Sequence, residues 1–191
     1  MKPWVVCLCT LSFTACLSSS RSPEARFYQL QPVRMEVEDV SFPYDGVLVD
    51  DVETAEYLDR PQMVVRQGEH RLDYLEFDRW AEPLDENFAD VLVANLASCL
   101  GSETPVGVNA RDGEHHVRVQ VRVVRFEGDP ERGAILEAVY GMEPMGWTER
   151  VRLRTEVKGE TLEAVVSAQS RLVGDLAREM ARRLSRIDES S

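Results

Sequence analysis

The chain has 191 residues, of which 34 are acidic and 22 are basic, so its formal net charge is −12. A chain of this charge repels phosphate groups. This excludes general electrostatic attraction to nucleic acid or to an anionic membrane surface as its mode of action. The length suits one domain with a substantial hydrophobic core.

The first residues predict export from the cytoplasm. Lys2 precedes the uncharged run 4–15, which is too short to cross a membrane because a helical crossing needs about 20 apolar residues. The run ends in Phe13-Thr14-Ala15-Cys16, which resembles the lipobox of bacterial lipoproteins, although Phe13 replaces the usual leucine. This resemblance implies that residues 1–15 are a signal peptide and that Cys16 is lipidated with acyl chains such as palmitate. An ordinary signal peptide with an incidental cysteine is the alternative.

Residues 16–26 follow as the lipidated cysteine and a flexible, Ser-rich tether, and residues 27–188 form the expected α+β domain. Cys99 is the only cysteine in that domain, so no intramolecular disulfide is expected. Its place on an apolar helical stripe predicts a core residue. Leu17 stands where an aspartate favours inner-membrane retention in enterobacterial lipoproteins, so the analogy favours the outer membrane.

Short strands are expected in the first part of the domain, over 27–30 and 33–40. The segment 41–56 has many acidic residues around the apolar Val47-Leu48-Val49. We expect a solvated acidic loop there, with room for one short strand. A calcium site would require oxygen ligands at fixed alternate spacing and a central glycine. Residues 63–65 and 74–77 predict the two strands of a hairpin.

Longer elements follow in the second part. Helices are expected over 83–100, ending at Gly101, and over 161–187. Alternating apolar and polar residues predict strands over 116–126 and 147–157, and shorter strands are expected over 105–109 and 134–140. These elements predict an α+β fold in which two long amphipathic helices pack on one face of a mostly antiparallel sheet.

Two sequence motifs resemble those of a known family. One begins Tyr57-Leu58-Asp59-Arg60-Pro61 and ends at Arg66, and the other is Arg79-Trp80-Ala81-Glu82-Pro83-Leu84. Both look like the PqiC (YmbA) family, the lipoprotein auxiliary components of ABC-type transport systems of the MCE kind. The resemblance covers nearly the whole mature chain and departs at 45–56, which we interpret as an acidic insertion. We expect structural roles for the motif residues Tyr57, Leu58, Asp59, Arg60, Pro61, Arg66, Trp80, Pro83 and Leu84.

The same resemblance implies a periplasm-facing lipoprotein of the outer membrane that is a non-catalytic docking subunit in intermembrane lipid transport. The implied partners are an MCE-domain protein, the bilayer through acylated Cys16, and further copies of the chain in a homo-oligomeric ring. Two alternatives stay open. One is a periplasmic carrier that holds an acyl chain between helices and sheet, and the other is an envelope-assembly lipoprotein.

The sequence contains none of the common catalytic or metal-binding motifs. It has no G-x-S-x-G, no H-E-x-x-H, no phosphate-binding glycine loop and no paired-cysteine motif. His115 and His116 are adjacent, so on a strand they point to opposite faces and cannot bind one metal. We therefore expect no enzyme activity, no cofactor and no metal. We expect Trp80 to pack against the sheet rather than to stack on a substrate.

Arginines alternate with apolar residues on two of the expected strands. They are predicted to point away from the apolar face of the sheet, and they are Arg118, Arg122, Arg150, Arg152 and Arg154. A solvated face in which Glu137, Glu149 and Glu156 interleave with the arginines is one interpretation. Our hypothesis is that part of this face docks an acidic partner or another copy of the chain.

Overall fold

The computed structural model describes residues 23–35, 44–101, 104–108 and 115–185. The larger of its two sheets has the strand order β5-β2-β6-β7-β8. The antiparallel part consists of β6 (His116–Asp129), β7 (Gly133–Glu143) and β8 (Trp147–Thr155). The parallel part adds β2 (Gly46–Thr54) between β6 and β5 (Val106–Val108).

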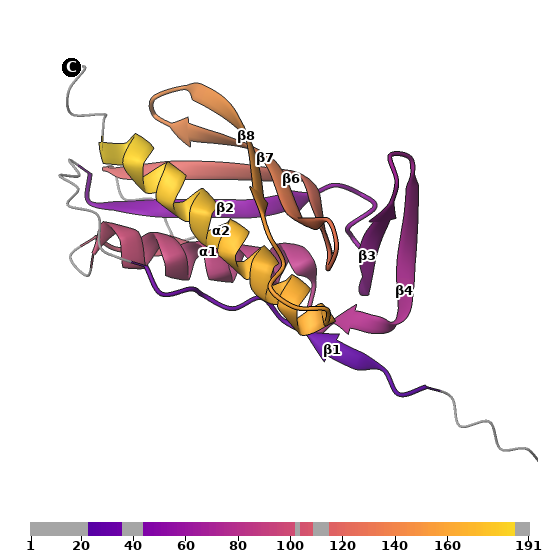
Figure 1. Cartoon of the computed structure of the whole chain (residues 1–191). Coiled ribbons are helices and arrows are strands. Elements are labelled where there is room, and N and C mark those ends of the chain that lie inside the picture. Colours follow the sequence, from indigo (N-terminus) through magenta and orange to yellow (C-terminus); the bar gives the residue numbers. More distant parts are fainter. Residues whose placement is uncertain (1–22, 36–43, 102–103, 109–114, 186–191) are drawn as a thin grey trace, which may run out of the picture.

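The smaller sheet has the order β1-β4-β3 and stands beside one end of the larger sheet (Figure 1). The hairpin expected from the sequence is confirmed and consists of β3 (Gln62–Gln67) and β4 (Arg71–Trp80). The short strand β1 (Arg26–Tyr28) adds to β4 in parallel. The sequence predicted one sheet, so the division into two sheets is a finding of the structure.

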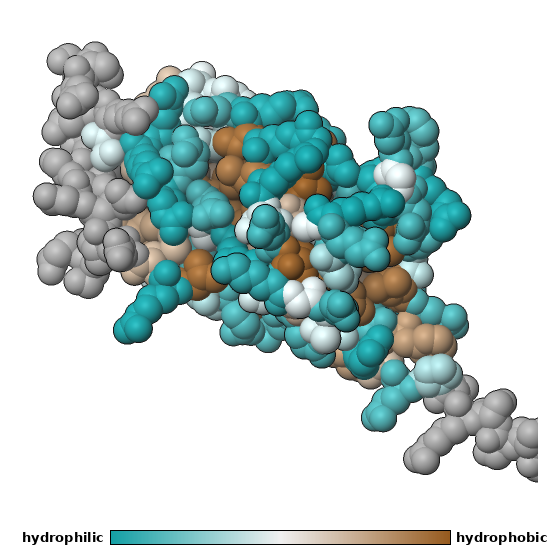
Figure 2. Space-filling model, viewed as in Figure 1, coloured by the Kyte–Doolittle hydropathy of each residue, from teal (hydrophilic) through white to brown (hydrophobic). Residues whose placement is uncertain are grey.

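The two predicted helices are confirmed as α1 (Leu84–Leu100) and α2 (Leu162–Ser185). They pack against each other and cover one face of the larger sheet (Figure 1). The fold is therefore α+β, as the sequence predicts. The side of the molecule that Figure 2 shows is mostly hydrophilic, with hydrophobic areas between the polar ones.

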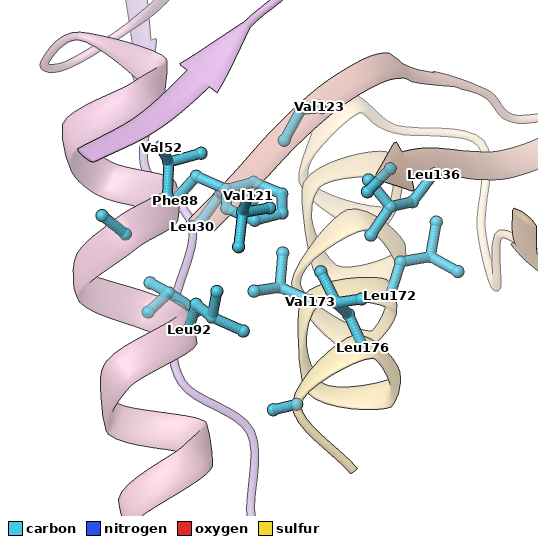
Figure 3. Close-up of a cluster of buried hydrophobic side chains, with 14 of the residues drawn as sticks. Leu30, Val52, Phe88, Leu92, Val121, Val123, Leu136, Leu172, Val173 and Leu176 are labelled. Carbon is cyan, nitrogen blue, oxygen red and sulfur yellow. The ribbon is translucent and has the colours of Figure 1, made fainter. Parts of the chain in front are cut away.

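The hydrophobic core lies between the helices and the larger sheet. Side chains of both helices meet those of β2, β6 and β7 there (Figure 3). The rings of Phe88 on α1 and Phe126 on β6 meet edge to face with their centroids 5.5 Å apart. Cys99 is fully buried in this core, as its helical position predicts. Alternation is clearest on β6, where Val117, Val119, Val121 and Val123 all face the core.

The short strand allowed for around Val47-Leu48-Val49 is confirmed, but it is longer than expected, and the prediction of an acidic loop is wrong for the rest of residues 46–54. These residues form β2, which is paired on both sides and therefore lies inside the sheet, so an insertion at 45–56 is also wrong. Val47, Leu48 and Val49 are buried, whereas Asp50 lies at a register irregularity and pairs with Arg118 of β6. In the sequence alone the acidic residues indicate a solvated loop, because the arginine that pairs with Asp50 is 68 residues away in the chain.

The prediction of a strand over 33–40 fails for its described part, because residues 33–35 belong to no strand. The remainder lies outside the described residues. Residues 30–33, which precede and begin this segment, are nevertheless held by the buried side-chain amides of Asn87 and Asn95 on α1. The Leu30 N–H donates to Asn87 Oδ1 at 2.7 Å, and the Val33 N–H donates to Asn95 Oδ1 at 3.0 Å.

Two glycines of the larger sheet provide a matched test of its packing. A Cβ placed on Gly128 of β6 would overlap the Val165 side chain of α2, whereas one on Gly141 of β7 would make ordinary contacts. We expect Gly128→Ala to lower the free energy of unfolding by about 1–3 kcal/mol, because a branched, buried neighbour has to shift. Gly141→Ala is the control and should be neutral or slightly stabilising. Urea unfolding measures both, and equal effects would contradict the close approach of α2 to β6.

Candidate docking surface

The outer face of the larger sheet, opposite the helices, carries the arginines singled out in the sequence. Arg118 and Arg122 come from β6, and Arg150, Arg152 and Arg154 come from β8, with β7 between these strands. The register places their side chains in rows across the sheet. The structure thus brings all five arginines to one face, on either side of β7.

Some of these arginines are neutralised by carboxylates of neighbouring strands. Arg118 Nη1 lies 2.5 Å from Asp50 Oδ1 on β2, and Arg152 Nε lies 2.9 Å from Glu137 Oε1 on β7. The predicted interleaving of Glu137 is therefore confirmed. It is wrong for Glu149, which lies on the helix-covered face, where it accepts a hydrogen bond from Tyr140 and pairs with Arg183.

The arginines of another row make no such ion pairs with the described residues. Arg122 and Arg150 lie opposite each other on either side of Val139, which separates them in the register of β6, β7 and β8. Both arginines are exposed, and neither makes an ion pair with the residues that the structure describes. Glu53 of β2 is the cross-strand neighbour of Arg122. We call Arg122, Val139 and Arg150 the arginine row.

A buried carboxylate that the sequence did not reveal supports this face. Glu127 on β6 has only 3% of its side chain exposed, yet it accepts hydrogen bonds from three residues. Arg66 of β3 binds it with Nε at 2.7 Å and Nη2 at 2.6 Å, Arg125 with Nε at 2.9 Å, and the Tyr57 hydroxyl at 3.0 Å. The Glu127 network therefore joins the smaller sheet to the larger one.

The electrostatics of the Glu127 network follow from this geometry. Burial alone raises the pKa of Glu127. The hydrogen bonds from Arg66, Arg125 and Tyr57 outweigh that effect and hold the pKa below its ordinary value of 4.5. Burial, followed by the negative charge of Glu127, raises the pKa of Tyr57 well above its ordinary value. Glu127 is therefore ionised at neutral pH and Tyr57 is not.

The other motif residues surround the same junction between the sheets. The Trp80 N–H donates to the Pro61 carbonyl at 2.7 Å, and the Arg60 guanidinium lies 4.9 Å from the ring centre of Tyr74. The Asn87 N–H donates to the carbonyl of Pro83 in the first turn of α1, and Asp59 is exposed beside the junction. The apolar members are buried, namely Leu58, Trp80 and Leu84.

A second buried carboxylate fixes the start of the domain. Asp78 on β4 accepts two hydrogen bonds from Arg26, at 2.7 and 2.9 Å, and one from the Tyr28 hydroxyl at 3.1 Å. Arg26 and Tyr28 both belong to β1, which is the first strand after the expected tether. The proposed lipidation residue, Cys16, lies outside the described residues.

Within the part of the chain that the structure describes, no group of three His, Cys, Asp or Glu side chains is arranged to hold a metal ion. None of the described helices combines the length and the apolar character needed to cross a membrane.

The Glu127 network predicts a pH-dependent contribution to stability. Glu127→Gln leaves two guanidinium groups without their carboxylate, so we expect a loss of about 2–3 kcal/mol in unfolding free energy at pH 7. Because folding lowers the pKa of Glu127, its stabilisation is present above pH 4.5 and is lost as the pH falls through the folded-state value. Urea unfolding between pH 7 and pH 3 should therefore show the wild type and the variant converging on the acidic side.

The control for this experiment is Glu131→Gln, which changes an exposed carboxylate in the turn between β6 and β7. It should change stability by less than about 0.5 kcal/mol across the pH range. A difference between wild type and Glu127→Gln that does not vary with pH would contradict the assignment of a charged Glu127.

The comparisons with known proteins agree with this architecture. The chain is similar to the crystal structure of an uncharacterized protein, at 19% identity and a TM-score of 0.73, covering 85% of this chain and 100% of that one. It is also similar to a protein from Xanthomonas campestris, at 16% identity and a TM-score of 0.72, covering 87% and 100%. At these identities the likeness concerns the fold. No curated protein matches the sequence. The model of one family matches residues 28–181, and the chain therefore belongs to the family of ABC-type transport auxiliary lipoprotein components.

Proposed function

We propose that this protein is a periplasm-facing lipoprotein of the outer membrane, anchored through Cys16, that docks an MCE-domain protein of a lipid transport system. Membership of a family of transport auxiliary lipoproteins supports the role in transport. The lipobox-like Phe13-Thr14-Ala15-Cys16 and the Leu17 that follows support the anchor and the choice of membrane. The role is non-catalytic, with ATP hydrolysis performed by other subunits.

The arginine row is the observation that supports docking. Two exposed guanidinium groups flank one apolar side chain on the outer sheet face, with Glu53 beside Arg122, in a chain whose net charge is −12. Such a surface attracts an acidic partner, although the chain as a whole is negatively charged. Arginine is well suited to this task because its planar group binds carboxylates with two hydrogen bonds. The partner is an acidic surface of the MCE-domain protein, or of a further copy of the chain in a ring.

A carrier function is less well supported by the packing. The layer between the helices and the larger sheet, where an acyl chain would lie, is filled by side chains from both sides (Figure 3). Phe88, Leu92 and Leu172 are fully buried there. An acyl chain in this layer would have to displace them at a cost of several kcal/mol. An envelope-assembly role uses the same anchor and differs only in the partner.

The anchor can be tested by cell fractionation. We expect the wild-type chain in the outer-membrane fraction and Cys16→Ala in the soluble fraction or retained with an uncleaved signal peptide, because the thiol that carries the acyl chains is absent. Cys99→Ala is the matched control and should stay in the outer membrane, since Cys99 is buried in the core. Mass spectrometry of residue 16 checks the modification, and an unmodified thiol on a soluble wild-type chain would contradict the anchor.

Docking can be tested by charge reversal in the arginine row. We expect Arg122→Glu/Arg150→Glu to reduce crosslinked recovery of the MCE-domain protein from membranes by about tenfold or more, because two favourable charges become repulsive. The control is Arg34→Glu/Lys158→Glu, which makes the same change in net charge at two exposed residues elsewhere. Circular dichroism checks that both variants fold. Equal recovery from both variants would contradict docking through this row, and recovery of an outer-membrane assembly protein instead would favour the alternative role.

A further inference from the structure

A hollow of about 190 Å³ lies at the end of the outer face, beside the arginine row. It is bounded by the β3–β4 hairpin on one side and by the ends of β6, β7 and β8 on the other. Four guanidinium groups line it, from Arg66, Arg125, Arg132 and Arg154, and two carboxylates, from Glu127 and Asp129. We call this hollow the arginine pocket.

The carboxylates of the arginine pocket are already engaged. Glu127 accepts hydrogen bonds from Arg66, Arg125 and Tyr57 on its two oxygens. Asp129 accepts the backbone N–H groups of the following turn at 2.9 and 3.1 Å. Both carboxylates thus have hydrogen-bond partners of their own, and neither pairs with the guanidinium of Arg132 or Arg154 across the hollow.

Two of the arginines keep free donors. Arg154 makes no ion pair or hydrogen bond with the described residues, and Arg132 uses only Nη1, which donates to the Arg66 carbonyl at 3.3 Å. The lining therefore has two more positive than negative charges, in a chain whose net charge is −12. A cation is repelled from such a pocket, and an anion is attracted.

The volume of the arginine pocket and the number of its guanidinium donors limit which anions it can bind. A volume of about 190 Å³ is below the roughly 300–1,000 Å³ of sites for drug-sized ligands, so an acyl chain does not fit. A carboxylate presents its two acceptor oxygens in one plane. A phosphate has at least three acceptor oxygens and can be bound by several arginines from different strands.

We propose that the arginine pocket binds a phosphate group, held by Arg132 and Arg154 with Arg125 as a third donor. Glu127 positions this third donor, because it binds Arg125 Nε at 2.9 Å. Arg125 Nη1 lies 3.8 Å from Glu137 Oε1, so Nη2 is the group that can donate to the ligand. The phosphate is either a free anion or the head group of a phospholipid whose acyl chains stay outside the pocket. This site does not depend on the proposed docking role, which uses the arginine row.

The test is calorimetric titration of the full chain in detergent with three probes. They are inorganic phosphate, phosphatidic acid, and diacylglycerol as the matched lipid without phosphate. Saturable binding of inorganic phosphate supports a site for the free anion. Saturable binding of phosphatidic acid alone, without binding of diacylglycerol, supports a head-group site.

The variants connect binding to the pocket. Arg132→Ala and Arg154→Ala should each weaken phosphate-dependent binding by about tenfold, and Arg154→Lys by less, because it keeps the charge but loses the fork. Arg150→Ala is the control, since it removes an exposed arginine of the same strand and face outside the pocket. Thermal unfolding checks that each variant folds.

Two results would overturn the proposal. One is that neither inorganic phosphate nor phosphatidic acid binds saturably to the wild-type chain. The other is that Arg150→Ala weakens binding as much as Arg154→Ala does, which would indicate attraction to the whole face rather than a built site. If an alanine variant unfolds, Arg154→Lys decides the outcome, because it retains the size and charge at this position.

Discussion

The buried carboxylate of Glu127 is the constraint on which the arrangement of the two sheets depends. A charged group with 3% exposure is tolerated only where donors surround it, and here they come from two sheets. Arg66 and Tyr57 belong to the hairpin side, and Arg125 belongs to β6 itself. Their hydrogen bonds fix the hairpin against the end of the larger sheet, and this contact also forms one wall of the arginine pocket.

The same chemistry is used a second time at the start of the domain. Asp78 is bound by one arginine and one tyrosine, both from β1, as Glu127 is bound by Arg66 and Tyr57. These hydrogen bonds hold the short strand β1 against β4. β1 and the end of α2 lie at opposite ends of the molecule, so the chain enters the domain far from the end of α2 (Figure 1).

The elements with regular alternation could be predicted from the sequence, and those that depend on distant partners could not. The alternating valines of β6 and the apolar stripes of both helices correctly predicted which faces of these elements are buried. The acidic β2 was missed because its partner Arg118 is 68 residues away in sequence. Glu127 was missed because a register irregularity between Val123 and Arg125 shifts the alternation by one residue. Beyond it, odd-numbered residues face outward, and the pair Val123-Val124 was the only local signal of this shift.

The arginine row and the arginine pocket lie on the same face of the sheet but are separated along β8. Arg150 and Arg154 are four residues apart on β8, which places their Cα atoms about 13 Å apart along an extended strand. The Debye length at physiological ionic strength is about 8 Å, so two exposed groups at this separation are largely screened from each other. Glu137 lies between them in the register, bound by Arg152 and near Arg125, and it screens them further. An anion in the pocket therefore leaves most of the attraction of the row intact, and one face can hold a phosphate and an acidic partner together.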